Sequence, residues 1–183
     1  VIISKQSGVA EVLDYAVKDT LEYRRSLNLN KGICSTEFIG DGVFYRQEVF
    51  ASAPDNVIVV RLSASRTGAL DVDVCFDRER DARFHLRGNE IVMEGQVVDE
   101  DNELAGKGGE NMRFASVLRI LPNGGRIVSK DGGMAIEDAD EAVLIFTAAT
   151  DYDPDDMDFD RSIDPLEVCD RIQEWNDFDI RRT

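Results

Sequence analysis

The stretch VIVVRLSASRTGALDVDVCF, residues 57–76, decides the fold class because its side chains repeat with a period of two residues. In its second half apolar side chains alternate with aspartates, so that one side of the segment holds Leu70, Val72, Val74 and Phe76. This alternation is typical of a β-strand with one face in a core and the other in water. The first eight residues are nearly all apolar and often β-branched, which favours a central strand buried on both faces.

The same period extends over most of the first 150 residues and predicts about nine or ten strands, with no helix of any length before residue 150. Glycine turns separate the strands, and Asn123-Gly124 between two alternating runs is the strongest hairpin signal in the chain. Gly95 inside a strand marks a bulge or a close backbone approach. The expected strands are 32–39, 43–50, 57–64, 70–76, 90–98, 113–121, 126–129, 134–137 and 141–150, with hairpin turns at 40–42, 122–125 and 130–133 and the longest loop at 99–111.

Strands of this number and spacing predict an all-β domain, a sandwich or a large barrel of antiparallel strands, over residues 1–150. Its N-terminal strands need not be complete. Residues 10–21 could form a helix on propensity alone, but their surroundings favour an irregular arm that leads into a strand near 25–29.

The pattern changes after residue 150, where an acidic segment and then a helix are expected. Asp164 fits the N-cap, Pro165 the first helical position and Glu167 the third. An apolar stripe follows at three-residue steps, made of Leu166, Cys169, Ile172 and Trp175. We therefore expect residues 151–183 to be an acidic linker and a linker helix that lead to a helical domain outside this chain.

Six aspartates lie within DYDPDDMDFD, residues 151–160, and two hypotheses describe them. A calcium loop of the EF-hand type fits at Asp151, Asp153 and Asp155, but Asp156 replaces its glycine and Ser162 its final glutamate. A solvated, extended linker needs none of these ligands, and it is the hypothesis that the spacing favours.

The residues predict no catalytic, cofactor-binding or metal-binding site. His85 is the only histidine and falls in an alternating strand, with no GxSxG segment to form a hydrolytic triad and too few ligands for zinc. Residues 106–109 (GKGG) lack the strand-to-helix setting of a phosphate loop. Carboxylates are abundant, but the sequence alone selects no catalytic pair among them.

A net charge of −16 and the absence of any apolar run near the roughly 20 residues of a spanning helix argue against nucleic-acid and membrane partners. Three cysteines cannot all be paired, and buried free thiols are the simpler interpretation. One bridge between Cys34 and Cys75 stays open for an exported protein.

Several segments resemble, in order, the N-terminal β-sandwich domain of glycoside hydrolase family 95, the inverting α-L-fucosidases and their relatives. These segments are EYRRSLNL (22–29), GVFYRQEVFASAPDNVIVVRLSA (42–64), TGALDVDV (67–74) and ADEAVLIFTAATDY (139–152). The matching positions are Tyr23, Arg24, Arg25, Leu27, Leu29, Tyr45, Glu48, Phe50, Ala51, Ser52, Pro54, Asp55, Arg61, Leu62, Ala64, Ala139, Asp140, Glu141, Ala149, Thr150 and Tyr152, whereas Gln47 stands where arginine is usual.

The resemblance implies an antiparallel super-sandwich that supports a catalytic (α/α)6 barrel, which hydrolyses α-linked fucose or L-galactose from oligosaccharides or glycans. It also implies that this chain is an internal, non-catalytic piece, inactive alone, with no cofactor, and that the parent enzyme is secreted or periplasmic. Arg24 and Arg25 are then expected to pair with the acidic edge or to cap carbonyl groups near the interdomain junction, rather than touch sugar. The alternative function is a stand-alone carbohydrate-binding module, for which Phe44, Tyr45 and Tyr152 are the candidate aromatic platform.

Overall fold

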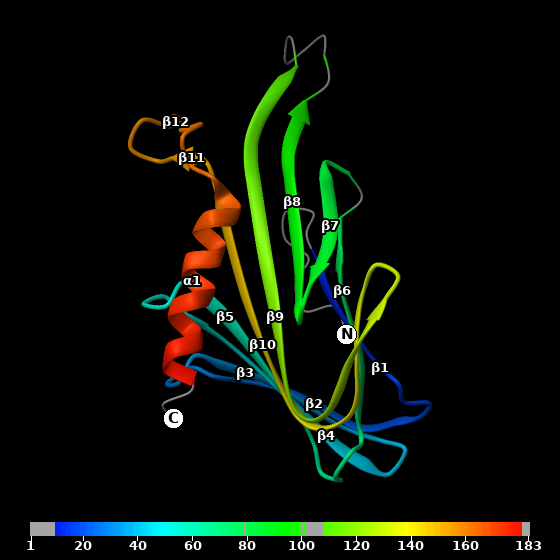
Figure 1. The fold of residues 1–183 in the computed structure, drawn as a ribbon. Helices are drawn as coiled ribbons and strands as arrows, with labels where there is room; N and C mark the ends of the chain where they lie inside the picture. The colour runs from blue at the N-terminus through cyan, green and yellow to red at the C-terminus, as the bar shows by residue number, and fades with distance from the viewer. Residues whose placement is uncertain (1–9, 79, 100, 102–107, 181–183) are drawn as a thin grey trace.

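The computed structural model describes residues 10–78, 80–99, 101 and 108–180, and for 10–12 and 175–180 it describes the backbone only (Figure 1). The described part is an antiparallel β-structure with a single helix, which confirms the predicted all-β sandwich class. Its elements are β1 (Ala10–Tyr15), β2 (Thr20–Asn28), β3 (Ile33–Gly40), β4 (Val43–Ser52), β5 (Val57–Ala64), β6 (Leu70–Asp77), β7 (Ala82–Arg87), β8 (Glu90–Asp99), β9 (Gly109–Lys130), β10 (Gly133–Thr150), β11 (Tyr152–Asp153), β12 (Asp158–Phe159) and α1 (Pro165–Ile180).

The strands form two layers that share their longest members. The larger layer runs in the order β2-β3-β4-β5-β10-β9-β8-β7, and β6 and β1 extend from the other half of β10. Residues 141–146 of β10 pair with β5, whereas residues 133–139 pair with β6. Inward-facing side chains of both layers form one core, which includes Leu13, Tyr15, Val60, Leu62, Leu70, Val72, Val74, Ile91, Met93, Leu118, Ile120, Ile136 and Leu144.

The predicted hairpin at Asn123-Gly124 is wrong, because β9 runs unbroken from Gly109 to Lys130. Gly124 and Gly125 have φ angles of 73° and 62°, and the pairing of β9 with β10 is irregular opposite them. A Cβ on Gly125 would lie 2.2 Å from the carbonyl oxygen of Glu137, so only glycine fits there. The glycines therefore form a bulge at the place where the two long strands pass from one layer to the other.

The expectations for residues 57–76 are confirmed in one half and corrected in the other. β6 alternates as predicted, with Leu70, Val72, Val74 and Phe76 all buried. β5 is central but not buried on both faces, since Val60 and Leu62 face the core while Arg61 is exposed. Its outer face is covered only in part, because the second layer packs on the inner face.

The N-terminal expectation is wrong for residues 10–15 and confirmed for the strand that follows. These six residues form β1, which pairs with β6 and places Leu13 and Tyr15 in the core. The pairing partner is about sixty positions away in the sequence, so local propensity does not reveal it. β2 includes the strand expected near 25–29, and its side chains are exposed along its whole length.

Other predicted turns and contacts are confirmed. Gly40, Asp41 and Gly42 connect β3 to β4, with positive φ at Asp41 and Gly42. A Cβ on Gly95 would meet the carbonyl oxygen of Asp81 at 1.9 Å, which is the predicted close approach. Most of the predicted loop at 99–111 lies outside the described residues, although its last part, from Gly109, belongs to β9.

The helix α1 lies along the outer face of the larger layer, across β9 and β10 (Figure 1). This face is opposite the core that the two layers share. In the described part of the chain no helix is long and apolar enough to cross a membrane.

Candidate functional site

The junction between α1 and the larger layer is the most elaborate side-chain arrangement in the described structure. Leu166 and Cys169 of the helix pack against Val92, Ala115 and Val117, the outward-facing residues of β8 and β9. The sequence analysis assigned this helix only to a connection toward a domain outside the chain, but its apolar stripe packs on the outer face of the sheet in this chain.

The N-terminal end of α1 is capped as the sequence predicts. Asp164 Oδ1 accepts a hydrogen bond from the amide of Leu166 at 2.9 Å, and Pro165 is buried at the first helical position. Of the predicted stripe, Cys169 is fully buried and Leu166 and Ile172 are half-buried. The side chain of Trp175 lies outside the described residues.

Sequence analysis missed a polar member of this face, Gln173, which is fully buried. Its Nε2 donates to the carbonyl oxygen of Ile145 at 3.0 Å and to that of Val117 at 3.4 Å. One side chain therefore connects the helix to both β9 and β10. A glutamine four residues after Cys169 is at helical spacing, but its polarity placed it outside an apolar stripe.

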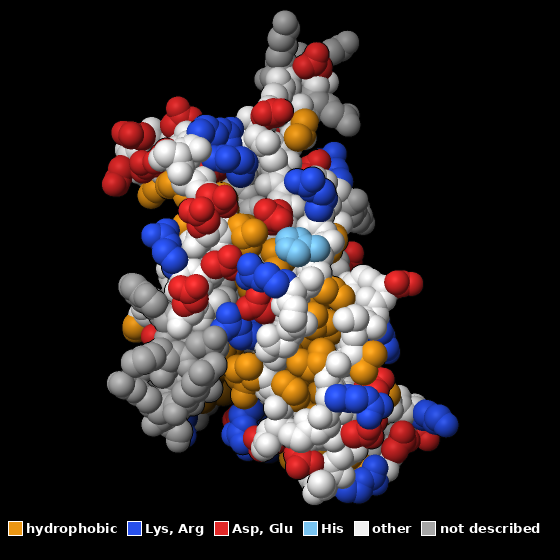
Figure 2. Space-filling view, viewed as in Figure 1, with side chains coloured by type: hydrophobic (Ala, Val, Ile, Leu, Met, Phe, Trp, Pro, Cys, Tyr) orange, Lys and Arg blue, Asp and Glu red, His pale blue; other side chains and the backbone are white. Residues whose placement is uncertain are grey.

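A cluster of four charged side chains connects α1 to β7, β8 and β9. Arg119 Nη2 lies 2.6 Å from Glu90 Oε1, and Arg87 Nε lies 2.7 Å from Glu90 Oε2. Arg87 Nη2 also lies 2.6 Å from Oδ1 of Asp170 on the helix. Hydrogen bonding to Asp170, more than that to Glu90, raises the pKa of Arg87 above its usual range despite partial burial. Figure 2 shows acidic and basic side chains interleaved over this face.

Asp151 is the centre of a second charged arrangement, at the N-terminal side of α1. Its side chain is fully buried, and its carboxylate accepts hydrogen bonds from Arg113 N (2.8 Å), Arg113 Nε (2.8 Å) and Arg161 Nη1 (2.5 Å). Burial alone would raise the pKa of Asp151, but these hydrogen bonds outweigh it and hold the pKa below the ordinary value of 3.8.

The prediction of solvated aspartates is thus wrong at Asp151 and confirmed for several of the aspartates after it, whereas the predicted extended path is wrong. Asp155 and Asp156 are exposed, and residues 152–159 form the small hairpin of β11 and β12. Among the described residues no three histidine, cysteine, aspartate or glutamate side chains converge as metal ligands. Both carboxylate oxygens of Asp151 are already occupied by arginine groups.

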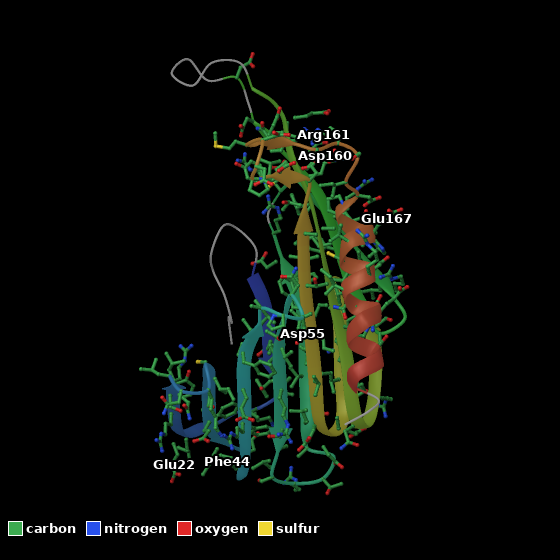
Figure 3. The ribbon with its side chains drawn as sticks, turned by 90° about the vertical axis from the view of Figure 1, so that its left-hand side faces the viewer. Glu22, Phe44, Asp55, Asp160, Arg161 and Glu167 are labelled. Atoms are coloured by element: carbon green, nitrogen blue, oxygen red, sulfur yellow. The ribbon has the colours of Figure 1, made fainter. Side chains whose placement is uncertain are left out.

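The candidate aromatic platform does not assemble. Tyr45 belongs to the core, where its ring packs against Tyr15 and Phe38 and its hydroxyl donates to the carbonyl oxygen of Ala69. Phe44 and Tyr152 are exposed. Phe44 and Asp160, which follows the β11–β12 hairpin, lie at opposite ends of the molecule (Figure 3).

The other residues that the sequence singled out are on the surface. His85 is exposed on β7, with Nδ1 3.7 Å from Glu94 Oε2. Arg24 and Arg25 are exposed on β2, and within the described residues neither forms an ion pair. Their expected contacts near the interdomain junction stay a prediction. Cys34, Cys75 and Cys169 are all free thiols, which excludes the Cys34–Cys75 bridge in this structure.

Two of the segments quoted for the family resemblance, 42–64 and 139–152, meet on the outer face of the sheet. Arg61 of β5 forms a two-pronged contact with Glu141 of β10, at 2.8 and 3.0 Å, and lies 4.0 Å from Glu48 of β4. Glu48 in turn pairs with Arg46 at 2.8 Å. The segments thus share a row of alternating charges across neighbouring strands.

Two shallow grooves open on the surface, one on each layer. The first lies over β1, β6 and the ends of β9 and β10, and its charged groups are largely paired, as in Lys130 with Asp73 and Arg126 with Glu137. The second lies between β7–β8 and the start of α1, beside Arg113 and Asp164.

Comparison with known proteins assigns this architecture to a family. The family described as "Glycosyl hydrolase family 65, N-terminal domain" matches residues 11–155, from β1 to the start of the β11–β12 hairpin. The chain belongs to this family. As a glycosyl hydrolase N-terminal domain, it contains the two layers within the matched region, and α1 follows that region.

This glycosyl hydrolase N-terminal domain is also 32% identical over 163 residues to Alpha-L-fucosidase 2 of Arabidopsis thaliana. The match includes 80% of this chain and 19% of that protein, so the chain spans about a fifth of the length of the curated relative. The expected relationship to the N-terminal domain of a fucosidase-like glycoside hydrolase is therefore confirmed.

Proposed function

We propose that this domain is the non-catalytic N-terminal support of an α-L-fucosidase-like glycoside hydrolase, whose (α/α)6 barrel removes α-linked fucose, or L-galactose, from oligosaccharides or glycans. The similarity to Alpha-L-fucosidase 2 supports the substrate class. The docking of α1 on the sheet supports the role as a structural support. A helix that packs on the sandwich can hold the domain that we propose to follow it in a fixed position.

The support works through rigidity. The helix is held by apolar packing at Cys169, by the hydrogen bonds of Gln173 to two strands, and by the ion pair of Asp170 with Arg87. The side chains of Arg87 and Asp170 are 43% and 34% exposed, so this ion pair contributes less than the apolar packing and the buried hydrogen bonds of Gln173. A helix held in this way provides a fixed starting point for a following domain.

The proposed partners follow from the same assignment. Carbohydrate, in the form of fucosylated glycans, reaches the full-length enzyme at its barrel, and the barrel itself is the intramolecular partner of this domain. We place the parent enzyme outside the cytoplasm, in the secreted or periplasmic space. The family resemblance supports this location.

The test compares the full-length gene product that contains this sequence with residues 1–183 alone. A chromogenic α-L-fucoside is supplied to both, with the matching α-D-galactoside as a control for specificity. We expect the full-length protein to hydrolyse the fucoside and residues 1–183 to be inactive. Hydrolysis by residues 1–183, or none by the full-length protein, would contradict the proposal.

The same preparations test the carbohydrate-binding module as the alternative. Isothermal titration calorimetry of residues 1–183 with fucosylated oligosaccharides is expected to show no saturable heat. Tight binding by residues 1–183 alone would favour the module, and the exposed rings of Phe44 and Tyr152 would then be the first positions to substitute.

A further inference from the structure

The buried carboxylate of Asp151 connects three pieces of the chain that are far apart in the sequence. It follows the end of β10, and it binds Arg113 of β9 and Arg161 of the segment before α1. The two arginines extend these contacts to the main chain. Arg113 Nη2 donates to the carbonyl oxygens of Arg161 (2.8 Å) and Ile163 (3.0 Å), and Arg161 Nη2 donates to that of Asn111 (3.0 Å).

The backbone of Asp151 contributes two further hydrogen bonds to the same arrangement. Its amide donates to the carbonyl oxygen of Arg113 at 3.1 Å, and its carbonyl oxygen accepts from the amide of Asp160 at 2.8 Å. We call Asp151, Arg113 and Arg161 the clamp. The clamp fixes the chain at residues 160, 161 and 163, so the segment between β10 and α1 lies against the start of β9.

The charges of the clamp make Asp151 its essential member. Two guanidinium groups face one carboxylate, and the Nη2 atom of each also donates to neutral carbonyl oxygens. The nearby carboxylate of Asp160 is engaged by the amide and hydroxyl of Ser162. Loss of the Asp151 charge would leave two cations close together without their anion, which favours separation of Arg161 from Arg113.

The clamp lies immediately before the helix. Ile163, whose carbonyl oxygen Arg113 holds, directly precedes the N-cap Asp164. Farther along α1, Asp170 and Gln173 are attached to the sheet by Arg87 and Arg119. Two separate attachments along one helix determine its direction, whereas one attachment leaves it able to pivot. Arg161 and Glu167 lie at successive points along this path (Figure 3).

We propose that Asp151 is a positioning residue, which sets the direction of α1 on the sheet and thereby the placement of the domain that follows the helix. This inference rests on the proposed function in so far as it predicts an effect on hydrolysis. Its effect on the path of residues 152–164 is independent of any activity.

The test substitutes Asp151→Asn in the full-length gene product, with Asp156→Asn as the matched control. Asp156 is exposed in the same segment, so the control makes the same change of charge outside the clamp. Hydrogen exchange is followed by mass spectrometry. We expect amides of residues 152–164 to exchange at least about ten-fold faster in Asp151→Asn, with β4 and β5 unchanged. Unchanged exchange in 152–164, or an equal increase in every strand, would overturn the proposal.

A second variant, Arg161→Met, keeps the proposal testable if Asp151→Asn fails to fold. It leaves the pair of Asp151 with Arg113 intact and removes only the guanidinium group that the segment between β10 and α1 contributes to the clamp. We expect the same local increase in exchange, and in both clamp variants a fall in kcat/KM of about ten-fold against the α-L-fucoside. Full kcat/KM in both variants despite faster local exchange would refute the positioning role.

The two proposals fail in distinguishable ways. If the wild-type full-length protein hydrolyses no fucoside, the proposed function fails while hydrogen exchange still decides the role of the clamp. If the wild type is active and the clamp variants match it in exchange and in rate, the clamp proposal fails alone.

Discussion

Arg119 on β9 and Glu90 on β8 form an ion pair beneath α1, with Nη2 2.6 Å from Oε1 and side chains only 12% and 8% exposed. The pair lies on the outer face of the sheet, where strand residues normally meet water. The helix changes that setting, because it covers the face and receives a hydrogen bond from Arg119 at the carbonyl oxygen of Gln173. The environment of this pair thus depends on whether the helix is docked.

We expect Glu90→Gln to lower the free energy of unfolding by about 3 kcal/mol, because it removes the charge of a carboxylate that pairs with both Arg119 and Arg87 and is largely shielded from water. Urea denaturation followed by circular dichroism measures this loss. Glu94→Gln on the same strand is the control, since the Glu94 side chain is 40% exposed, and it is expected to cost less than about 0.5 kcal/mol. Equal losses in the two variants would show that Glu90 is no more shielded than Glu94.

Gly125→Ala should be among the most damaging substitutions in the chain. Its φ is positive, and the new Cβ would collide with the carbonyl oxygen of Glu137. Gly132→Ala serves as the control, because Gly132 also has positive φ but open space around it. We expect the control to cost about 1 kcal/mol and Gly125→Ala at least about 2 kcal/mol more, measured by thermal and urea unfolding. Similar costs would mean that the bulge can relax.

Tyr45→Ala should lower the free energy of unfolding by about 3–5 kcal/mol, because the ring is packed against Tyr15 and Phe38. Tyr45→Phe removes only the hydroxyl that donates to Ala69 and should cost about 1 kcal/mol. Urea unfolding curves for both variants test this. Phe44→Ala, at an exposed ring, is the comparison, and a loss there as large as for Tyr45→Ala would contradict the assignment of Tyr45 to the core.

In denaturant all three cysteines should react with a thiol reagent. In the folded protein we expect them to react at different rates. Burial, more than the nearby Asp170, raises the pKa of Cys169 to about 12, so its reactive thiolate is nearly absent at neutral pH. Cys34 and Cys75 are only half-buried. Alkylation at pH 8 followed by peptide mapping should modify these two before Cys169. A count of one thiol in denaturant would mean that a disulfide forms.

Stability should fall in acid in a way that depends on Asp151. The pKa of its carboxyl is lower in the folded protein than the ordinary 3.8. Its contribution to the free energy of unfolding is therefore complete above pH 3.8. The contribution is lost as the pH falls through the lower, folded value. The difference in unfolding free energy between wild type and Asp151→Asn should be constant from about pH 7 to pH 5 and shrink below about pH 3.8.

That difference is the quantity to measure, because other groups titrate in the same range. The pKa of Asp160 is also lowered, by its hydrogen bonds from Ser162, and the nearby charge of Asp151 opposes this lowering. Arg113 and Arg161 are the other charged groups of the clamp. A difference that grows toward low pH would reverse the sign and contradict the assignment.

Most strands could be predicted from the sequence because alternation is a local property. In β6 each side chain points opposite to its neighbours, and the apolar set at Leu70, Val72, Val74 and Phe76 needs only one covered face. The cap at Asp164 was equally local, since the donor amide lies two residues away. The family relationship was predictable too, from the order of short segments along the chain.

The long-range contacts were not predictable in the same way. Asn123-Gly124 predicts a hairpin because glycine allows positive φ, but a bulge within a long strand has the same requirement. Only the pairing of β9 and β10 on both sides of the glycines distinguishes the two. Residues 10–15 became a strand because β6 lies beside them.

The sequence by itself determined the strand-rich class, the position of α1 and the family, since each depends on spacing within a few residues or on the order of segments. Only the tertiary structure decided that β9 and β10 join two layers, that α1 docks on their outer face, and that Asp151 is buried. Asp151 shows the physical reason. An aspartate among aspartates is expected to be in water, and its burial is stabilised by Arg113, which is 38 positions away in the chain.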